Sequence, residues 1–208
     1  MTPLCVRYLA PLAIEAVAIR RGAPRATIER IGMGPDRARQ STEGLLARDL
    51  APRPTVLLGV AGGLHEGDLP GEIIVASSLI AGPDEPEIAL EGVVALAELL
   101  GRERLRVKVG RMVSVSAIVH GEENRRALAD RGALGVDMES YWCAPLQRVH
   151  PFAVVRVLLD VPGRELRSPA VLATAREAYR SLKIVSRTLA TWSPVSVDGY
   201  PLPEVGEN

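Results

Sequence analysis

The sequence has few cysteines, few aromatic residues and no excess of charge of either sign, and these shortages exclude several classes of protein. It contains two cysteines, Cys5 and Cys143, in 208 residues, and 3% of its residues are aromatic. Two cysteines do not make a disulfide framework, which agrees with a reducing compartment. The 25 basic side chains balance the 25 acidic ones, and no basic cluster interleaved with aromatics appears. We therefore expect no nucleic-acid partner, and a small ligand fits better.

Long hydrophobic runs and metal-ligand spacings are absent as well. No apolar run approaches about 18 residues and no cleavable signal pattern is visible, so we expect no stable membrane insertion and a cytoplasmic location. The three histidines, His65, His120 and His150, lie far apart with no cysteine or carboxylate at ligand spacing. We therefore expect neither a metal nor another cofactor.

Short runs rich in Val and Ile alternate with longer segments of helical period. This alternation predicts an α/β fold, a single three-layer α/β/α domain around a central mixed, mostly parallel sheet. We expect one domain over residues 1–193 and a surface or disordered tail over 194–208, where proline is frequent and periodicity is lost. The expected strands begin at six positions, which are Leu4, Ala26, Thr55, Glu72, Val107 and Phe152.

Six helices are expected between and after these strands. Ser168 and Pro169 mark the last helix, because serine is a good N-cap and proline suits the first helical position. The six expected starts lie near Leu12, Pro35, Glu87, Gly121, Met138 and Ser168.

The stretch "GALGVDMESYWCAPL" leads from a strand-like segment into a helix-like one and contains two carboxylates around Met138. In one interpretation Asp137 caps the helix and Glu139 is an ordinary charge in its first turn. In the other, Glu139 accepts hydrogen bonds from two neighbouring hydroxyls, as a ribose presents, while Met138 covers the sugar ring. The stretch alone favours the first interpretation.

Further unusual residues follow other strands. Gly32 and Gly34 come after the second strand, Ala61 and Gly62 come at the end of the third, and Asp160 ends the sixth. Ligands of such sheets gather beyond the carboxyl ends of the strands. Glycine turns and turn-capping aspartates are also ordinary exits from strands.

Taken in order, four segments resemble the nucleoside phosphorylase and nucleosidase superfamily. They are "GMG" at 32–34, "PTVLLGVAGGLHEGDLPGEIIVAS" at 54–77, "GVDMES" at 135–140 and "PFAVVRVLLD" at 151–160. The superfamily includes purine nucleoside phosphorylases, methylthioadenosine/S-adenosylhomocysteine nucleosidases and futalosine hydrolases. The resemblance implies an enzyme that cleaves the N-ribosidic bond of a nucleoside, with a homodimer or higher homo-oligomer as its state.

The resemblance also implies roles for individual residues. Glu139 would hold the 2′ and 3′ hydroxyls of the ribose, and Met138 would lie against the sugar. Asp160 would protonate the leaving base, and the apolar residues before it predict a setting that keeps a carboxyl group protonated near neutral pH. Glu15 would activate water and Arg156 would lie near the nucleophile.

Each of these residues also has a purely structural interpretation. Asp160 would cap a turn, Glu15 would be a solvated helix charge, and Arg156 would form a buried salt bridge to a carboxylate such as Glu15. The resemblance adds four candidates for substrate binding, Val136, Ala61, Gly62 and Ile118.

The sequence departs from the superfamily at several positions. Leu57 and Val60 stand where phosphorylases bring an arginine and a serine to phosphate, which favours water as the nucleophile. Leu159 replaces a serine near the base, and Ile118 replaces an aromatic residue that stacks on it. These changes predict looser or more apolar recognition of the base, although Leu and Ile at such positions commonly pack a core.

The short chain and the "VRVLLDVPGRELRSPA" segment resemble the hopanoid-associated phosphorylase-like branch in particular. That branch implies release of adenine from a 5′-modified nucleoside such as adenosylhopane. The alternatives are a phosphorylase, a methylthioadenosine, S-adenosylhomocysteine or futalosine nucleosidase, and a non-catalytic nucleoside-binding protein.

Overall fold

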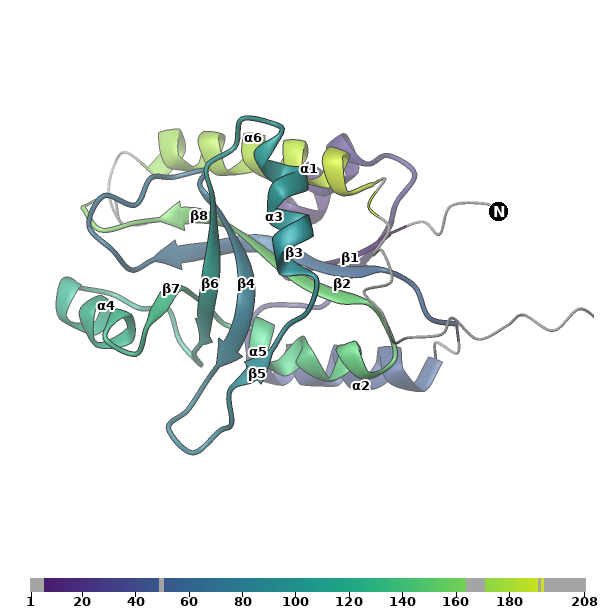
Figure 1. The fold of residues 1–208 in the computed structure, drawn as a ribbon, viewed down its shortest axis with the longest axis horizontal. Helices are drawn as coiled ribbons and strands as arrows, with labels where there is room; N and C mark the ends of the chain where they lie inside the picture. The colour runs from purple at the N-terminus through teal and green to yellow at the C-terminus, as the bar shows by residue number, and fades with distance from the viewer. Residues whose placement is uncertain (1–5, 49–50, 164–170, 191, 193–208) are drawn as a thin grey trace, which may run out of the picture.

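The computed structural model describes residues 6–48, 51–163, 171–190 and 192, and within them one sheet organises the fold. Its strands run in the order β2-β1-β3-β7-β6-β4-β5, and β8 pairs with both β3 and β4 (Figure 1). The strands are β1 (Arg7–Ala10), β2 (Thr27–Arg30), β3 (Thr55–Gly63), β4 (Ile73–Ile80), β5 (Ile88–Ala89), β6 (Val107–Ser114), β7 (Ala133–Asp137) and β8 (Phe152–Asp160).

The sheet is mixed and mostly parallel, as the sequence predicts. The parallel pairs are β1 with β2, β1 with β3, β3 with β8, β4 with β6, and β6 with β7. The antiparallel pairs are β3 with β7, β4 with β5, and β4 with β8. Parallel strands that are buried on both faces need nearly continuous apolar sequence, which β3, β4 and β8 supply.

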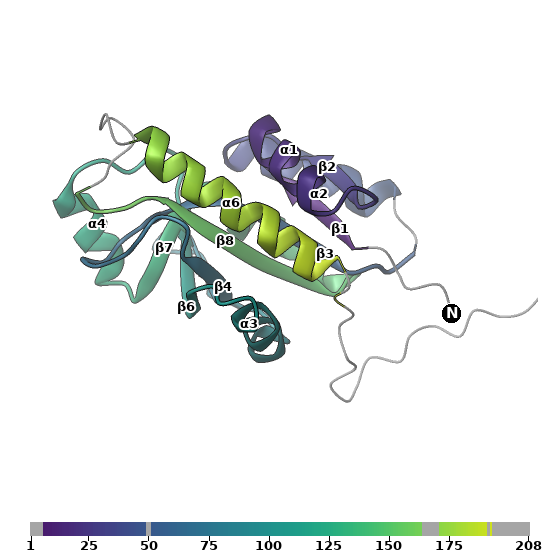
Figure 2. The ribbon, with the colours of Figure 1, turned by 90° about the horizontal axis from the view of Figure 1, so that it is seen from above.

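Helices cover both faces of this sheet. Helices α1 (Ala13–Gly22), α3 (Val93–Gly101) and α6 (Val171–Leu189) lie on one side, and Figure 2 shows α6 running along β8. Helices α2 (Pro35–Arg48) and α5 (Ser140–Cys143) lie together on the other side, and a 3₁₀ helix over Ala144–Arg148 follows α5. Helix α4 (Glu122–Ala129) lies beside β7. Two large apolar cores result, one on each face of β3 and β8, and a third, smaller core lies between β7 and α4.

All six expected strands are present, and the differences lie in the shorter elements. The sequence predicts a helix from about Glu87, and this prediction is wrong. Ile88 and Ala89 instead pair antiparallel with Leu79 and Ser78 as β5, and α3 begins only at Val93. A two-residue strand has too little pattern to recognise, and its apolar residues extend the helical period of α3 backwards.

The other differences concern one further strand and the start of one helix. β7 is not among the expected strands, although the segment before Asp137 reads as strand-like. The helix expected near Met138 begins at Ser140 and lasts one turn before the 3₁₀ helix continues it. The start expected at Ser168 and the tail over 194–208 lie outside the described residues.

An irregularity in the β3–β8 pairing changes the direction of side chains near the end of both strands. Ala61 pairs with Leu158, but Gly62 pairs with Asp160, so Leu159 is an extra residue in the ladder. A β-bulge of this kind bends a strand and redirects the residues after it. Here it sets the direction of Asp160.

The described residues contain no helix that is both long and apolar enough to cross a membrane.

Candidate active site

The junction between β7 and α5 is organised by the buried carboxylate of Asp137. Its Oδ1 accepts hydrogen bonds from the backbone N–H groups of Glu139 and Ser140, each at 3.2 Å, and from Ser114 Oγ at 2.6 Å. Its Oδ2 accepts a short hydrogen bond from Ser140 Oγ. Asp137 therefore satisfies backbone N–H groups at the start of α5, but the N-cap residue of this helix is Glu139 and not Asp137 as the structural interpretation of the sequence predicts.

Glu139 is not the ordinary first-turn charge of that interpretation, because its side chain is buried and points toward the turn at Gly34. Its Oε1 accepts a hydrogen bond of 2.9 Å from the backbone N–H of Gly34. A Cβ on Gly34 would lie 3.8 Å from the Met138 methyl carbon, so Met138 also lies beside this turn. The "GMG" and "GVDMES" segments, 105 residues apart, thus meet at one place.

Arg156 of β8 lies between the carboxylates of Asp137 and Glu139 and contacts both. Its Nε donates to Asp137 Oδ2 at 2.7 Å and its Nη2 donates to Glu139 Oε2 at 3.1 Å, and the side chain is fully buried. Burial and the charge of Asp137 raise the pKa of Glu139, although Arg156 opposes this rise. The Nη1 atom of Arg156 is buried and has no hydrogen-bond partner in the described part of the protein.

Glu15 lies in the first turn of α1 with 1% of its surface exposed, so the interpretation as a solvated helix charge is wrong. Its Oε1 accepts a hydrogen bond from the Val60 backbone N–H at 2.8 Å, and its Oε2 accepts one from the Leu12 N–H at 2.6 Å. Burial raises the pKa of Glu15 to about 7, although Arg156 and the two backbone hydrogen bonds lower it. A carboxyl group that titrates near neutral pH suits proton transfer.

Gly59 of β3 allows Glu15 and Arg156 to come together. A Cβ at this position would lie 2.5 Å from Arg156 Nη1 and 2.8 Å from Glu15 Oε1. Any larger residue would displace one of these two charged groups. Arg156 does form a buried salt bridge, as the structural interpretation of the sequence predicts, but its partners are Asp137 and Glu139 and not Glu15.

Asp160 ends β8 and is buried, but its surroundings are not apolar as the sequence predicts. Nη2 of Arg125, in α4, lies 2.8 Å from Asp160 Oδ2 and forms an ion pair with it. A neighbouring guanidinium favours the charged carboxylate over the protonated acid. The prediction of an apolar setting is wrong because it considers only the three residues before Asp160 and not the helix that packs over the strand end.

The remaining predicted substrate-binding residues are distributed around this edge. Val136 and Ala61 are buried, and a Cβ on Gly62 would lie 3.0 Å from Val136 Cγ1. Ile118 follows β6 in the loop before α4 and is 48% exposed.

Three positions at which the sequence departs from the superfamily pack into the protein. Leu57 is fully buried in the core on the α2 side of the sheet. Val60 and Leu159 are partly buried against the core on the α6 side. For Leu159 the structure agrees with the core-packing interpretation, whereas Ile118 is 48% exposed and does not pack in a core.

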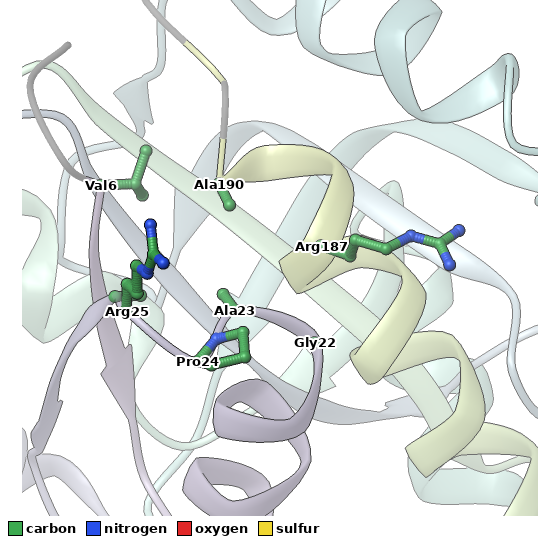
Figure 3. A pocket seen from close by; sticks show the side chains of 8 residues that line it. Val6, Gly22, Ala23, Pro24, Arg25, Arg187 and Ala190 are labelled. Carbon is green, nitrogen blue, oxygen red and sulfur yellow. The ribbon is translucent and has the colours of Figure 1, made fainter.

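Two cavities lie outside the carboxylate cluster. One, of about 660 Å³, lies between α4, the loop after β3 and the end of β8; it is lined by Leu64–Gly67, Glu122, Arg125, Arg126, Ala129, Asp130, Pro162 and Gly163. The other, of about 320 Å³, lies near the start of β1 and the ends of α1 and α6, and Figure 3 shows Arg187 pointing away from the other labelled residues. None of the predicted site residues lines this second cavity, and no group of three or more potential metal ligands occurs among the described residues.

Arg125 and Asp137 are the main residues of the site that sequence reasoning did not assign to it. Asp137 had a signal, because it precedes Met138 and Glu139 at a strand end. Arg125 had none, since "EENRRALA" is a polar helical sequence in which neighbouring arginines look alike.

Comparison with known proteins places this arrangement in a family. Residues 11–190 match the family described as the phosphorylase superfamily. No curated protein matches the chain.

Several solved structures share the fold. The 5′-methylthioadenosine/S-adenosylhomocysteine nucleosidase of Neisseria meningitidis, in complex with methylthio-immucillin-A, has a TM-score of 0.75 and 18% identity over 90% of this chain and 99% of its own. The native futalosine hydrolase of Helicobacter pylori has a TM-score of 0.73 and 18% identity over 91% of this chain and 97% of its own. The match over residues 11–190 covers most of the sequence, and the chain therefore belongs to the phosphorylase superfamily.

Proposed function

We propose that the protein is a purine nucleoside N-ribosyl hydrolase that releases adenine from a 5′-modified nucleoside. The observation that carries this proposal is the buried Glu15, whose pKa is raised to about 7, close to the Glu139–Arg156 pair. A buried carboxyl group that titrates near neutral pH costs stability and serves chemistry. A non-catalytic nucleoside-binding protein would have no need of it.

The proposed reaction assigns one step to each group. Glu139 exchanges its present hydrogen bonds for the ribose 2′ and 3′ hydroxyls, with Met138 against the sugar. The bond between the anomeric carbon and the base breaks, and its electron pair moves to the base, which takes a proton that the Asp160 carboxylate has first bound from solvent. Water adds to the anomeric carbon and gives its proton to Glu15, so the products are the free base and a sugar with an anomeric hydroxyl.

The charges around Arg156 support water over phosphate as the nucleophile. Asp137, Glu139 and Glu15 all act electrostatically on this one guanidinium. A phosphate dianion entering this space would meet more carboxylate than guanidinium charge. Leu57 lies in the core and Val60 is apolar, so neither side chain offers a donor to phosphate.

The 5′ side of the substrate is the finer part of the proposal. The structural neighbours include a futalosine hydrolase and a 5′-methylthioadenosine/S-adenosylhomocysteine nucleosidase, and the name of the second indicates a 5′-substituted nucleoside. Met33, beside the Gly34 turn, is 46% exposed and Ile118 is 48% exposed, and both offer apolar surface to a substituent. Together with the sequence resemblance to the hopanoid-associated branch, these residues favour adenosylhopane as the substrate. Val60 and Leu159 pack into the core and do not add to this argument.

The substrate proposal is tested by comparing kcat/KM for adenosine, methylthioadenosine and a 5′-alkyl adenosine below its micelle concentration. If even a few methylenes leave water on binding, each contributes about 0.8 kcal/mol, so the alkyl nucleoside is the best of the three. Should methylthioadenosine exceed the alkyl nucleoside by about tenfold, a difference of about 1.4 kcal/mol, the methylthioadenosine nucleosidase alternative replaces the hydrocarbon substrate.

We also propose that residues 1–193 act as one domain in a cytoplasmic homodimer or higher oligomer. Ile14 and Val17, on α1 beside the site, are 53% and 49% exposed and offer apolar surface to a second copy. Sedimentation equilibrium measures the assembly directly, and a monomer at micromolar concentration would contradict it.

A further inference from the structure

Arg125 is exceptional among the residues of α4. Glu122, Glu123 and Asn124 before it and Arg126 after it are exposed to solvent, whereas Arg125 is 1% exposed. A short polar helix that buries an arginine has to compensate the loss of hydration of that charge. The partners of Arg125 therefore indicate what the helix does.

Two contacts connect Arg125 to the end of the β3–β8 pair. Its Nη1 donates to the carbonyl oxygen of Gly63 at 2.6 Å, and its Nη2 donates to Asp160 Oδ2 at 2.8 Å. The same guanidinium thus binds the backbone of β3 and the carboxylate at the end of β8, the strand that pairs with β3. A Cβ on Gly62 would lie 3.5 Å from Nη1, so the small residues of the "AGG" turn leave room for this approach.

The stability of the fold does not account for this arrangement by itself. A buried ion pair loses hydration on both sides, and apolar residues of similar volume commonly replace such pairs at no cost in stability. The side chains of Arg125 and Asp160 are 2% and 9% exposed. The bulge at Leu159 also shifts the β3–β8 register, so that Asp160 pairs with Gly62 beside the point where Arg125 contacts both strands.

We propose that Arg125 is a positioning residue for the acid step, which holds the Asp160 carboxyl group in place and stabilises the carboxylate that remains after the base has taken its proton. This inference rests on the proposed nucleosidase function and extends it to a residue of α4. Arg125 itself exchanges no proton. It acts through Asp160.

The chemistry of the leaving group separates this role from a structural one. When the bond to adenine breaks, the base leaves as a poor anion and needs the proton of Asp160. A 4-nitrophenolate leaving group is stable as an anion and needs no proton. A variant in which the Asp160 carboxyl group is no longer held in place should therefore release adenine more slowly and release nitrophenolate at an unchanged rate.

The test compares Arg125→Met with the wild type on methylthioadenosine and on 4-nitrophenyl riboside. A positioned general acid contributes about 100-fold or more, so we expect kcat on methylthioadenosine to fall by about tenfold or more and kcat on the nitrophenyl riboside to stay within about threefold. Asp160→Asn should show the same selectivity with a larger loss. Arg125→Lys keeps the charge and should recover part of the lost rate.

Arg126→Met is the matched control, because Arg126 is the next residue of α4 and pairs on the surface with Glu122 at 3.1 Å. It should leave both rates unchanged. If Arg125→Met lowered kcat equally on both substrates and Arg125→Lys recovered none of the loss, Arg125 would only support the fold. That result would overturn the inference about Arg125 and leave the proposed nucleosidase function standing. A wild-type protein that cleaves neither substrate would overturn both.

Discussion

At the scale of single residues, Glu139 shows how the protein holds one buried carboxylate in a fixed orientation. Its two oxygens accept hydrogen bonds from the Gly34 N–H and from Arg156, which keeps the side chain in one orientation. Burial raises its pKa, and the guanidinium of Arg156 opposes this effect. The cluster thus limits the cost of keeping a charge buried where ribose hydroxyls are proposed to bind.

Glu139→Gln should weaken the binding of nucleosides and leave the binding of free adenine unchanged. A charge-assisted hydrogen bond contributes about 1.5 to 3 kcal/mol, and free adenine has no hydroxyls to lose it. Titration calorimetry with adenine and with a non-hydrolysable nucleoside analogue measures both effects. Equal weakening of the two ligands would mean that Glu139 only supports the β7–α5 junction.

The residue scale is also where prediction from sequence reached its limit. Asp160 stood out because it ends an expected strand, and Glu139 stood out because it lies where a strand-like segment passes into a helix-like one. Arg125 did not stand out, since its burial and its contacts with Gly63 and Asp160, which distinguish it from Arg126, depend on the tertiary structure. A local pattern cannot report a partner that lies 35 residues away.

At the scale of elements, the buried strands were predictable because both of their faces are apolar. β3, β4 and β8 read as continuous Val, Leu and Ile runs between turn residues. The short β5 was not predictable, because two residues carry no period and their pairing with β4 depends on tertiary contact. The late start of α3 follows from the same cause.

The contact between α1 and α6 provides a prediction about elements alone. Gly22, at the end of α1, lies so close to α6 that a Cβ would overlap Ser186 Oγ and the Lys183 carbonyl oxygen. Gly22→Ala should therefore lower the free energy of unfolding by about 1 to 3 kcal/mol, because the two helices must move apart. Urea denaturation measures this change.

Gly44→Ala is the matched control for that experiment. Gly44 lies inside α2, and nothing lies within 4 Å of the position of its Cβ. Alanine is the better helix former, so this variant should gain about 0.5 to 1 kcal/mol. If both variants changed stability in the same direction, helix propensity and not the α1–α6 contact would dominate.

At the scale of the whole molecule, the burial of Glu15 links activity to stability through pH. The pKa of Glu15 is raised from 4.5 to about 7 in the folded protein, so the folded state binds this proton more tightly than the unfolded chain does. Its contribution to stability is present below about pH 4.5 and is lost as pH rises through about 7, where the buried carboxylate forms. The same carboxylate is the form that activates water, so kcat/KM should rise over the pH range in which this contribution is lost.

Glu15→Gln tests this link because glutamine cannot ionise. Relative to the wild type, the variant should gain about 3 kcal/mol in the free energy of unfolding between about pH 5 and about pH 8, while its activity is lost. Glutamine can accept only one of the two backbone hydrogen bonds that Val60 and Leu12 donate to Glu15. This loss lowers the free energy of unfolding of the variant by a similar amount at every pH, so it does not affect the change between about pH 5 and about pH 8. Parallel stability curves for the two proteins would show that Glu15 does not titrate in this range.

Analysis of the reaction products distinguishes hydrolysis of a nucleoside from its phosphorolysis. The protein is incubated with methylthioadenosine in phosphate-free buffer that contains oxygen-18-labelled water, and adenine and the sugar product are followed by liquid chromatography and mass spectrometry. The account predicts release of adenine together with a free sugar that carries the label at its anomeric carbon, at a rate that added phosphate does not change. Release that requires phosphate and yields a sugar 1-phosphate, or no release of adenine at all, would contradict it.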